Sequence, residues 1–163
     1  MIDQISILSP TAILGYGFPE ESFLAGLERK PDAIAVDAGS TDPGPFYLGS
    51  GQPFTDREAV KRDLRLMVEA GLNLDIPILI GTAGGSGAKP HVDWCVEIVD
   101  EVLIELNQSA RVATIFADQD PTTLFQALEN GAISSLGPVP TLTVSDIEDS
   151  SFIVAQMGVE PVI

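Results

Sequence analysis

Cysteine and histidine are each present only once in this chain of 163 residues, as Cys95 and His91. A single cysteine excludes an internal disulfide and gives no sign of an oxidising compartment. One cysteine and one histidine also exclude a Cys/His metal centre built within the chain. A hard divalent cation on the carboxylates of Asp37, Asp42 or Asp118 is the one metal that stays open, and we predict no metal site.

Positive charge is scarce as well, with 8 Lys and Arg against 24 Asp and Glu, which gives a formal net charge of -16. Such a charge repels phosphate backbones and anionic lipid head groups, so we expect neither nucleic acid nor membrane-surface binding. The N-terminus lacks the basic-then-apolar order of a signal peptide, and no apolar run approaches the ~18 residues needed to span a bilayer. We therefore expect a cytoplasmic protein.

Hydrophobic residues are plentiful, at 45% of the chain, which is enough for one sizeable core. Short β-branched runs alternate with longer stretches in which an apolar residue recurs every three or four positions. This alternation predicts one α/β domain over residues 1–163, with a doubly wound, mainly parallel sheet, Rossmann-like or flavodoxin-like, flanked by helices. The apolar ending leaves two interpretations open: the chain is the N-terminal part of a larger protein or assembly, or the tail docks on its own sheet.

Local signals place the individual elements of this fold. The run at 76–80 is nearly all apolar, which predicts a central strand covered on both faces. The spacing of Thr55 and Glu58 is that of a capping box at the start of a helix that ends near Gly71. The expected strands lie at 5–8, 33–36, 76–80, 112–116, 141–144 and 152–155, and the expected helices at 19–29, 55–71, 90–106 and 121–131.

A first glycine-rich loop, residues 37–51, follows an expected strand. Open parallel sheets bind ligands beyond the carboxyl ends of their strands, where this loop falls. Ser40 and Thr41 offer hydroxyls there, and Asp37 and Asp42 could act as base or acid. Alternatively, the glycines only let the loop turn and the aspartates accept backbone N–H groups in Asx turns. We favour a functional role, because long connections without secondary structure are uncommon in compact domains.

A second glycine-rich loop, residues 81–91, runs from the expected central strand into a helix. Free N–H groups at a helix start, with Lys89 nearby, would hold a phosphate or carboxylate. Pro90 after Lys89 excludes a Walker A motif, and no ribose-binding acid follows at the right distance. His91 could be a general acid or base or a purely structural helix-start residue. Ser40 or Ser86 as its nucleophilic partner is disfavoured, since neither lies in G-x-S-x-G.

These two loops supply all the predicted site residues, and no cofactor is identified. The predicted catalytic residues are Asp37, His91 and Asp42. The predicted contacts to a small anionic ligand are glycines, hydroxyl-bearing residues and one lysine: Gly39, Ser40, Thr41, Gly44, Tyr47, Thr82, Gly84, Gly85, Ser86, Gly87 and Lys89.

Residues 37–49 and 81–87, with His91, Asp93 and Trp94, resemble the acyclic terpene utilisation (AtuA) family. The resemblance covers roughly the first 120 residues and is carried mainly by the first loop. Members of that family are considerably longer, so the chain is similar to their N-terminal part. The resemblance implies a role in the catabolism of branched or acyclic acids, often alongside a small partner protein. It implies a site and no particular reaction.

Three functions follow from these patterns. The first is a catabolic enzyme or enzyme subunit, a lyase or isomerase, that acts on a small carboxylate or acyl thioester by proton transfer in hydration, dehydration or isomerisation. The second is a noncatalytic subunit that docks on a partner protein. The third is a phosphate or nucleotide sensor. We also expect the chain to form a homo-oligomer or to bind a partner protein.

Overall fold

A three-stranded parallel sheet forms the centre of the computed structural model, which describes residues 4–40, 44–156 and 158–162. The sheet has the order β1-β2-β3, with β1 (Ile7–Leu8), β2 (Ala33–Asp37) and β3 (Ile78–Gly81). The helices are α1 (Glu20–Leu27), α2 (Gly44–Ser50), α3 (Arg57–Leu74), α4 (Lys89–Leu106), α5 (Pro121–Glu129) and α6 (Val144–Asp149). Short 3-10 turns lie at η1 (Ala83–Gly85) and η2 (Glu160–Val162). The prediction of a mixed α/β fold is confirmed.

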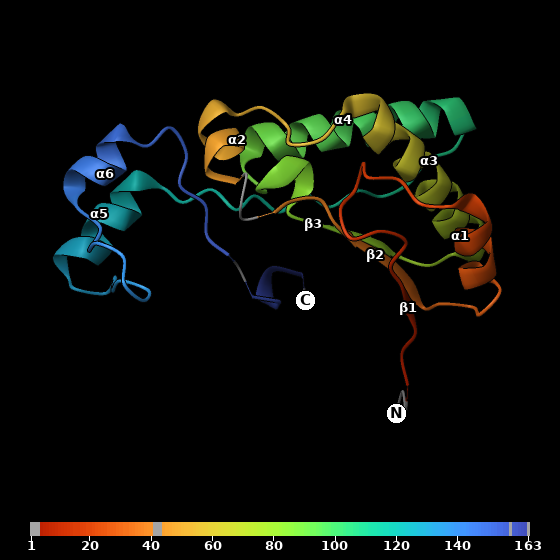
Figure 1. The fold of residues 1–163 in the computed structure, drawn as a ribbon, viewed down its shortest axis with the longest axis horizontal. Coiled ribbons are helices and arrows are strands. Elements are labelled where there is room, and N and C mark those ends of the chain that lie inside the picture. The colour runs from red at the N-terminus through yellow and green to blue at the C-terminus, as the bar shows by residue number, and fades with distance from the viewer. Residues whose placement is uncertain (1–3, 41–43, 157, 163) are drawn as a thin grey trace.

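The strand order explains where the helices lie. Parallel strands joined by right-handed crossovers place the connecting helices on one face when the order advances in one direction. Figure 1 shows α1, α3 and α4 on the same side of the sheet. The register pairs Ile34 with Ile78 and Asp37 with Gly81, so β2 and β3 end side by side.

The core lies between this helical layer and the sheet. Helix α3 repeats apolar residues at three and four, and its fully buried Leu64 and Met67 face the sheet and α4. Ile34 of β2 and Ile98 and Val102 of α4 are equally inaccessible. At the helix surfaces, Arg57, Lys61 and Arg65 of α3 pair with Glu101 and Glu105 of α4.

Helix α3 differs from its predicted bounds at both ends. Its N-cap is Asp56, whose side chain accepts the N–H of Ala59 at 3.0 Å, and not Thr55. Gly71 does not end the helix. A Cβ at Gly71 would lie 2.7 Å from Cδ1 of Ile78, so this glycine lets β3 approach the helix closely.

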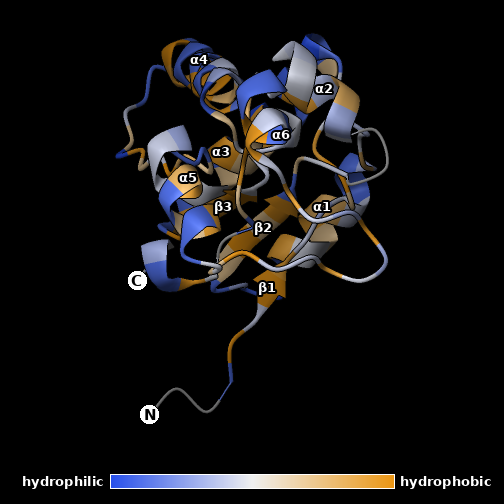
Figure 2. Ribbon diagram, turned by 90° about the vertical axis from the view of Figure 1, so that its left-hand side faces the viewer, coloured by the Kyte–Doolittle hydropathy of each residue, from blue (hydrophilic) through white to orange (hydrophobic). Residues whose placement is uncertain are grey.

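The opposite face of the sheet carries exposed apolar side chains. Ile7 is 57% exposed and Leu79 is 42% exposed. The orange strands in Figure 2 show how apolar this sheet is. Strand β3 was predicted to be central, but β2 is its partner on one side and it forms an edge of the described sheet. A doubly wound arrangement, with helices on both faces, stays a prediction.

Residues 109–162 form what we call the C-terminal segment, whose helices α5 and α6 pack together beyond the end of the sheet (Figure 1). The apolar residues buried in its described part are Ala117 and Ile147. Residues 109–116 are all exposed and have no regular structure. The predicted strand at 112–116 is therefore wrong, because no strand among the described residues pairs with this run.

The two other predicted strands of this segment are also corrected. The run 141–144 was predicted as a strand, but Thr143 caps α6 in a capping box with Asp146. The run 152–155 contributes one antiparallel bridge, between Val154 and Asp118. Across the described ranges, no helix combines the length and the apolar character that crossing a membrane requires.

Candidate functional site

The loops that follow the three strands converge at the carboxyl edge of the sheet. The N–H of Leu14, in the loop after β1, donates to the Asp37 carbonyl oxygen at 2.8 Å. The N–H of Ala38 donates to the Gly81 carbonyl oxygen at 2.9 Å. A Cβ at Gly39 would lie 2.5 Å from the carbonyl oxygen of Gly85, so only glycine permits this contact between the two glycine-rich loops. The two loops thus form one surface.

Helix α2 occupies the second half of the first glycine-rich loop, which was predicted to be irregular. Pro45 after Gly44 suits a first helical turn, where no intrahelical N–H bond is needed. Predicted ligand residues Gly44 and Tyr47 lie on this helix, and Ser40, at the end of the described stretch before it, is half-buried. Asp42 and Thr41 lie outside the described residues.

Four aromatic side chains gather around α2, and we call them the aromatic cluster: Tyr16, Phe46, Tyr47 and Phe54. The ring of Tyr47 lies edge-on to Phe46 at 5.2 Å and to Phe54 at 5.5 Å between centroids. Tyr16 lies 6.2 Å from Phe54. Tyr16 and Phe46 are 63% and 71% exposed. An exposed aromatic surface therefore borders the glycine-rich loops.

The second glycine-rich loop is a tight turn pressed against the start of α4. Gly84 has φ of 69°, and a Cβ there would lie 2.5 Å from the carbonyl oxygen of His91. The N–H groups of Gly85 and Gly87 donate to the carbonyl oxygens of Thr82 and Ala83. These glycines therefore shape the turn and allow close packing on α4.

The chain's own side chains occupy the start of α4, where an anion was predicted to bind. The N–H of Lys89 donates to the Asp118 carboxylate at 2.7 Å, and the N–H of Ala88 donates to Oγ of Ser86 at 3.2 Å. The ammonium of Lys89 pairs with Asp93 at 2.6 Å. A ligand carboxylate at this helix start would have to displace Asp118.

His91 and Ser86 form a hydrogen-bonded pair beneath this surface. His91 is fully buried, and its Nδ1 lies 2.6 Å from Oγ of half-buried Ser86. Its Nε2 lies 2.7 Å from the carbonyl oxygen of Gln52. Burial lowers the pKa of His91, against the opposing effects of hydrogen bonds to the Gln52 and Tyr47 carbonyls and of the Asp118 charge. Burial thus favours the neutral form of the His91 ring.

Of the two predicted catalytic residues that the structure describes, Asp37 and His91, Asp37 reaches solvent. It is the last residue of β2 and is exposed, and its Oδ1 accepts the N–H of Gly39 at 3.1 Å. This bond is an Asx turn, which fixes the direction of the carboxylate. The described residues hold no group of three or more metal-ligating side chains.

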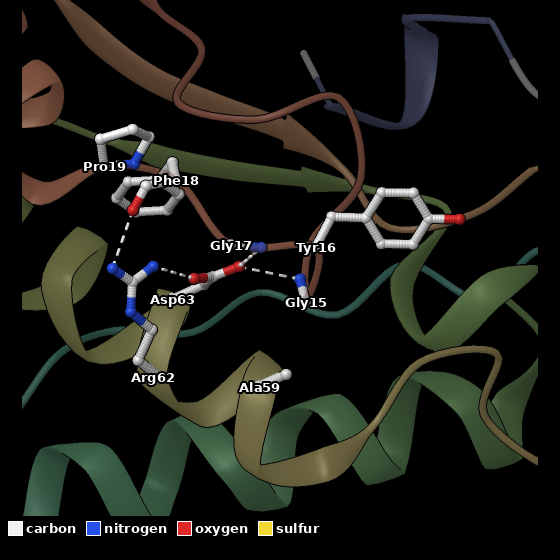
Figure 3. Close-up of a pocket in the computed structure, with 8 residues that line it drawn as sticks. All are labelled: Gly15, Tyr16, Gly17, Phe18, Pro19, Ala59, Arg62 and Asp63. Carbon is white, nitrogen blue, oxygen red and sulfur yellow. Dashed lines mark hydrogen bonds and ion pairs between the residues drawn. The ribbon is translucent and has the colours of Figure 1, made fainter.

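Sequence reasoning missed Asp63, whose fully buried carboxylate holds the loop after β1 (Figure 3). Its Oδ2 accepts the N–H groups of Gly15 and Gly17 at 3.0 and 3.1 Å, and Oδ1 pairs with Arg62 at 2.7 Å. The Arg62 guanidinium also lies over the ring of Phe18 at 4.9 Å. These groups line a shallow hollow and bind one another, so Asp63 anchors a loop. An aspartate beside the apolar stripe of α3 was the available signal.

Compared with known proteins, the chain matches no family model, no curated protein and no solved structure. The resemblance to the acyclic terpene utilisation family therefore stays a prediction.

Proposed function

We propose that the chain is a catabolic enzyme or enzyme subunit that moves a proton next to the carbonyl of a small carboxylate or acyl thioester, as a lyase or isomerase does. One observation supports this most directly: the packing of Gly39 on Gly85 places the exposed Asp37 carboxylate and the Ser86–His91 pair at the same edge of the sheet. Exposed and buried proton-transfer groups at one edge suit acid–base chemistry.

Asp37 is assigned the role of base. A carboxylate can take a proton from the carbon next to a carbonyl, and the bond from the Gly39 N–H holds Asp37 in one orientation. His91 is fully buried, so it acts on the ligand only through the Ser86 hydroxyl. The acidic chain favours a ligand whose reacting end is uncharged, which a thioester provides and a free carboxylate does not.

Proton exchange in D2O tests this role with S-butanoyl N-acetylcysteamine as the probe. The chain should speed the replacement of hydrogen by deuterium next to the thioester carbonyl, measured by NMR. Asp37→Asn should slow this exchange by about 100-fold or more, because general base catalysis contributes that much.

The control is Asp32→Asn, the same substitution just before β2 at the opposite edge of the sheet, where Asp32 accepts the N–H of Ser6. Exchange should be unchanged in this variant. Unchanged exchange in Asp37→Asn, or an equal loss in Asp32→Asn, would remove Asp37 from the mechanism.

A noncatalytic subunit is the second candidate, and the uncovered sheet face supports it. Ile7 and Leu79 expose apolar surface on that face, whereas parallel sheets are covered on both faces in folded proteins. A partner protein lying there would supply the second layer of a doubly wound sheet. Sedimentation velocity, which reports the oligomeric state, and the fluorescence of a hydrophobic dye test this candidate. A monomer that binds no dye contradicts it. Dye binding that is lost in the double variant Ile7→Ser, Leu79→Ser supports it.

The third candidate, a phosphate or nucleotide sensor, gains no support from the geometry. The Lys89 ammonium is paired with Asp93, and Asp118 holds the backbone N–H that a phosphate would use. A calorimetric titration with ATP that gives no heat would eliminate this function.

A further inference from the structure

The hydrogen-bond partners of His91 determine which way its protons point. The Gln52 carbonyl oxygen can only accept, so Nε2, at 2.7 Å from it, carries the hydrogen of the neutral ring. Nδ1 is then an acceptor, and the Ser86 hydroxyl, at 2.6 Å, must donate to it. This is the arrangement in which a histidine removes a proton from a serine nucleophile, with a third group orienting the base.

The pair is held rigidly in that arrangement. Gly84 has no Cβ, which allows the turn to lie against the backbone of His91. The N–H of Ala88 donates to Ser86 Oγ at 3.2 Å, which fixes the hydroxyl oxygen from a second direction. The thiol of Cys95 is unsuited to this chemistry, because burial raises its pKa to about 11.

The aromatic cluster lies against Gly85, the residue before Ser86. A Cβ at Gly85 would lie 3.1 Å from Cβ of Phe54, and the N–H of Phe54 donates to the Gly84 carbonyl oxygen at 3.3 Å. Phe54 in turn contacts Tyr16 and Tyr47. An apolar group bound to Ser86 would thus find an exposed aromatic surface beside it.

We infer that Ser86 is a nucleophile that accepts the acyl group of a thioester, with His91 as its general base and the aromatic cluster as the surface for an apolar acyl chain. This inference goes beyond the proposed function: it takes the same substrate class, a thioester, at the same edge of the sheet, but adds a hydrolysis reaction in which Asp37 has no part. It requires no G-x-S-x-G elbow, because the glycines around Ser86 and the Gln52 carbonyl perform the positioning.

The reaction balances with water as the second reactant. Ser86 Oγ attacks the thioester carbonyl carbon while its proton passes to Nδ1 of His91. The carbon–sulfur bond breaks, and the leaving thiolate takes that proton to become a thiol. Water then attacks the Ser86 ester, giving one proton to His91, which returns it to Ser86 Oγ as the carboxylic acid leaves. The sum is thioester and water to acid and thiol.

Diisopropyl fluorophosphate tests this role, because it phosphorylates activated serines with loss of fluoride. Intact-mass and peptide mass spectrometry of the full chain should show one adduct, on Ser86. Ser86→Ala should give none. His91→Gln should form the adduct about 100-fold more slowly, the usual contribution of a general base. Ser145→Ala, on exposed α6, is the matched control and should be labelled at the rate of the unchanged chain.

Ser86→Cys keeps the inference testable if removal of the hydroxyl or the histidine impairs folding. This variant should lose the fluorophosphate adduct and react with iodoacetamide faster than a free thiol at pH 7, since His91 would take the thiol proton. An adduct that persists in Ser86→Ala, the absence of any adduct on Ser86, or ordinary thiol reactivity in Ser86→Cys would overturn the inference. The proposed function fails separately, when Asp37→Asn leaves deuterium exchange unchanged while Ser86 is still labelled.

Discussion

Residues 4–108, which we call the N-terminal layer, and the C-terminal segment differ sharply in how they bury apolar side chains. The N-terminal layer packs α3 and α4 on the sheet around fully buried residues such as Leu64 and Ile98. In the C-terminal segment, the described residues bury Ala117 and Ile147, while Leu136 is 90% exposed. Burial of apolar surface is the dominant stabilising term, so the stability of the chain should reside in the N-terminal layer.

The candidate site follows the same division. Its loops extend from strands of the N-terminal layer, and hydrogen bonds from both the backbone and a side chain attach the C-terminal segment to them. The N–H of Ala117 donates to the Gly87 carbonyl oxygen at 2.9 Å, and Asp118 accepts the N–H of Lys89. The segment therefore covers part of the site without building it.

Among the predictions that compare the two regions, removing a core leucine should change the free energy of unfolding most. Leu64→Ala leaves a cavity in the N-terminal layer and should lower the free energy of unfolding by about 3 kcal/mol. The control, Leu136→Ala in the C-terminal segment, should change it by less than about 0.5 kcal/mol. Urea denaturation followed by circular dichroism measures both. Equal effects would abolish the difference between the two regions.

Asp63→Asn should have the next largest effect. The variant keeps the shape of the side chain but loses the charge that pairs with Arg62 and binds two backbone N–H groups in a buried position. We expect a loss of about 2 kcal/mol in the same urea experiment. Asp146→Asn, in the exposed capping box of α6, is the counterpart and should cost less. A larger loss at Asp146 would mean that α6 contributes more to folding than its burial indicates.

Asp118→Ala removes a contact between the two regions and should lower stability by about 1 kcal/mol, the usual contribution of one hydrogen bond. Glu129→Ala, on exposed α5, should have no measurable effect. Urea midpoints compare the two variants. If Asp118→Ala costs as much as Leu64→Ala, the C-terminal segment is an integral part of the core structure.

Mild acid should have the smallest effect, through His91. Burial places the pKa of His91 in the folded chain below its ordinary value of about 6.5. As the pH falls from 7.5 to 5.5, the unfolded chain takes up a proton before the folded chain does, so stability decreases. His91→Gln should flatten this part of the curve, measured by urea midpoints at the two pH values. If stability depends on pH as steeply in this variant as in the unchanged chain, a group other than His91 is responsible.

A second loss of stability is expected in a separate, more acidic pH range. Hydrogen bonds from Arg57, followed by Lys61, lower the pKa of Glu101 to about 2. This carboxylate stabilises the folded chain above its ordinary pKa, and that contribution is lost as the pH falls toward 2. The two windows can therefore be separated in one pH series.

Elements of the N-terminal layer could be predicted from sequence because their signals are local. Helices α3 and α4 and strand β2 follow from apolar periodicity. In the C-terminal segment, α5 follows from its Asp120 cap, which is also a local signal. The run 112–116 carries the same β-branched signal as a strand, yet a strand needs a neighbour to pair with, and local sequence does not report one. The position of β3 at the edge of the sheet depends on the order of strands for the same reason.

The candidate site was predictable in location but not in its contacts. The rule that ligands bind at the carboxyl ends of parallel strands locates both glycine-rich loops. The pairing of Ser86 with His91 depends on the close approach permitted by Gly84, and Asp118 reaches Lys89 from 29 residues away in the sequence. Such contacts arise from tertiary packing, so spacing alone could not reveal them.

Hydrogen–deuterium exchange of the full chain, with and without S-butanoyl N-acetylcysteamine, tests most directly whether the loops of the N-terminal layer form the ligand site. Without the probe, peptides from α3 and α4 should exchange slowly and those from 109–116 rapidly. With the probe, protection should rise in peptides covering 37–54 and 81–91. Protection confined to the C-terminal segment, or absent at saturating probe, would contradict the assignment of the site to these loops.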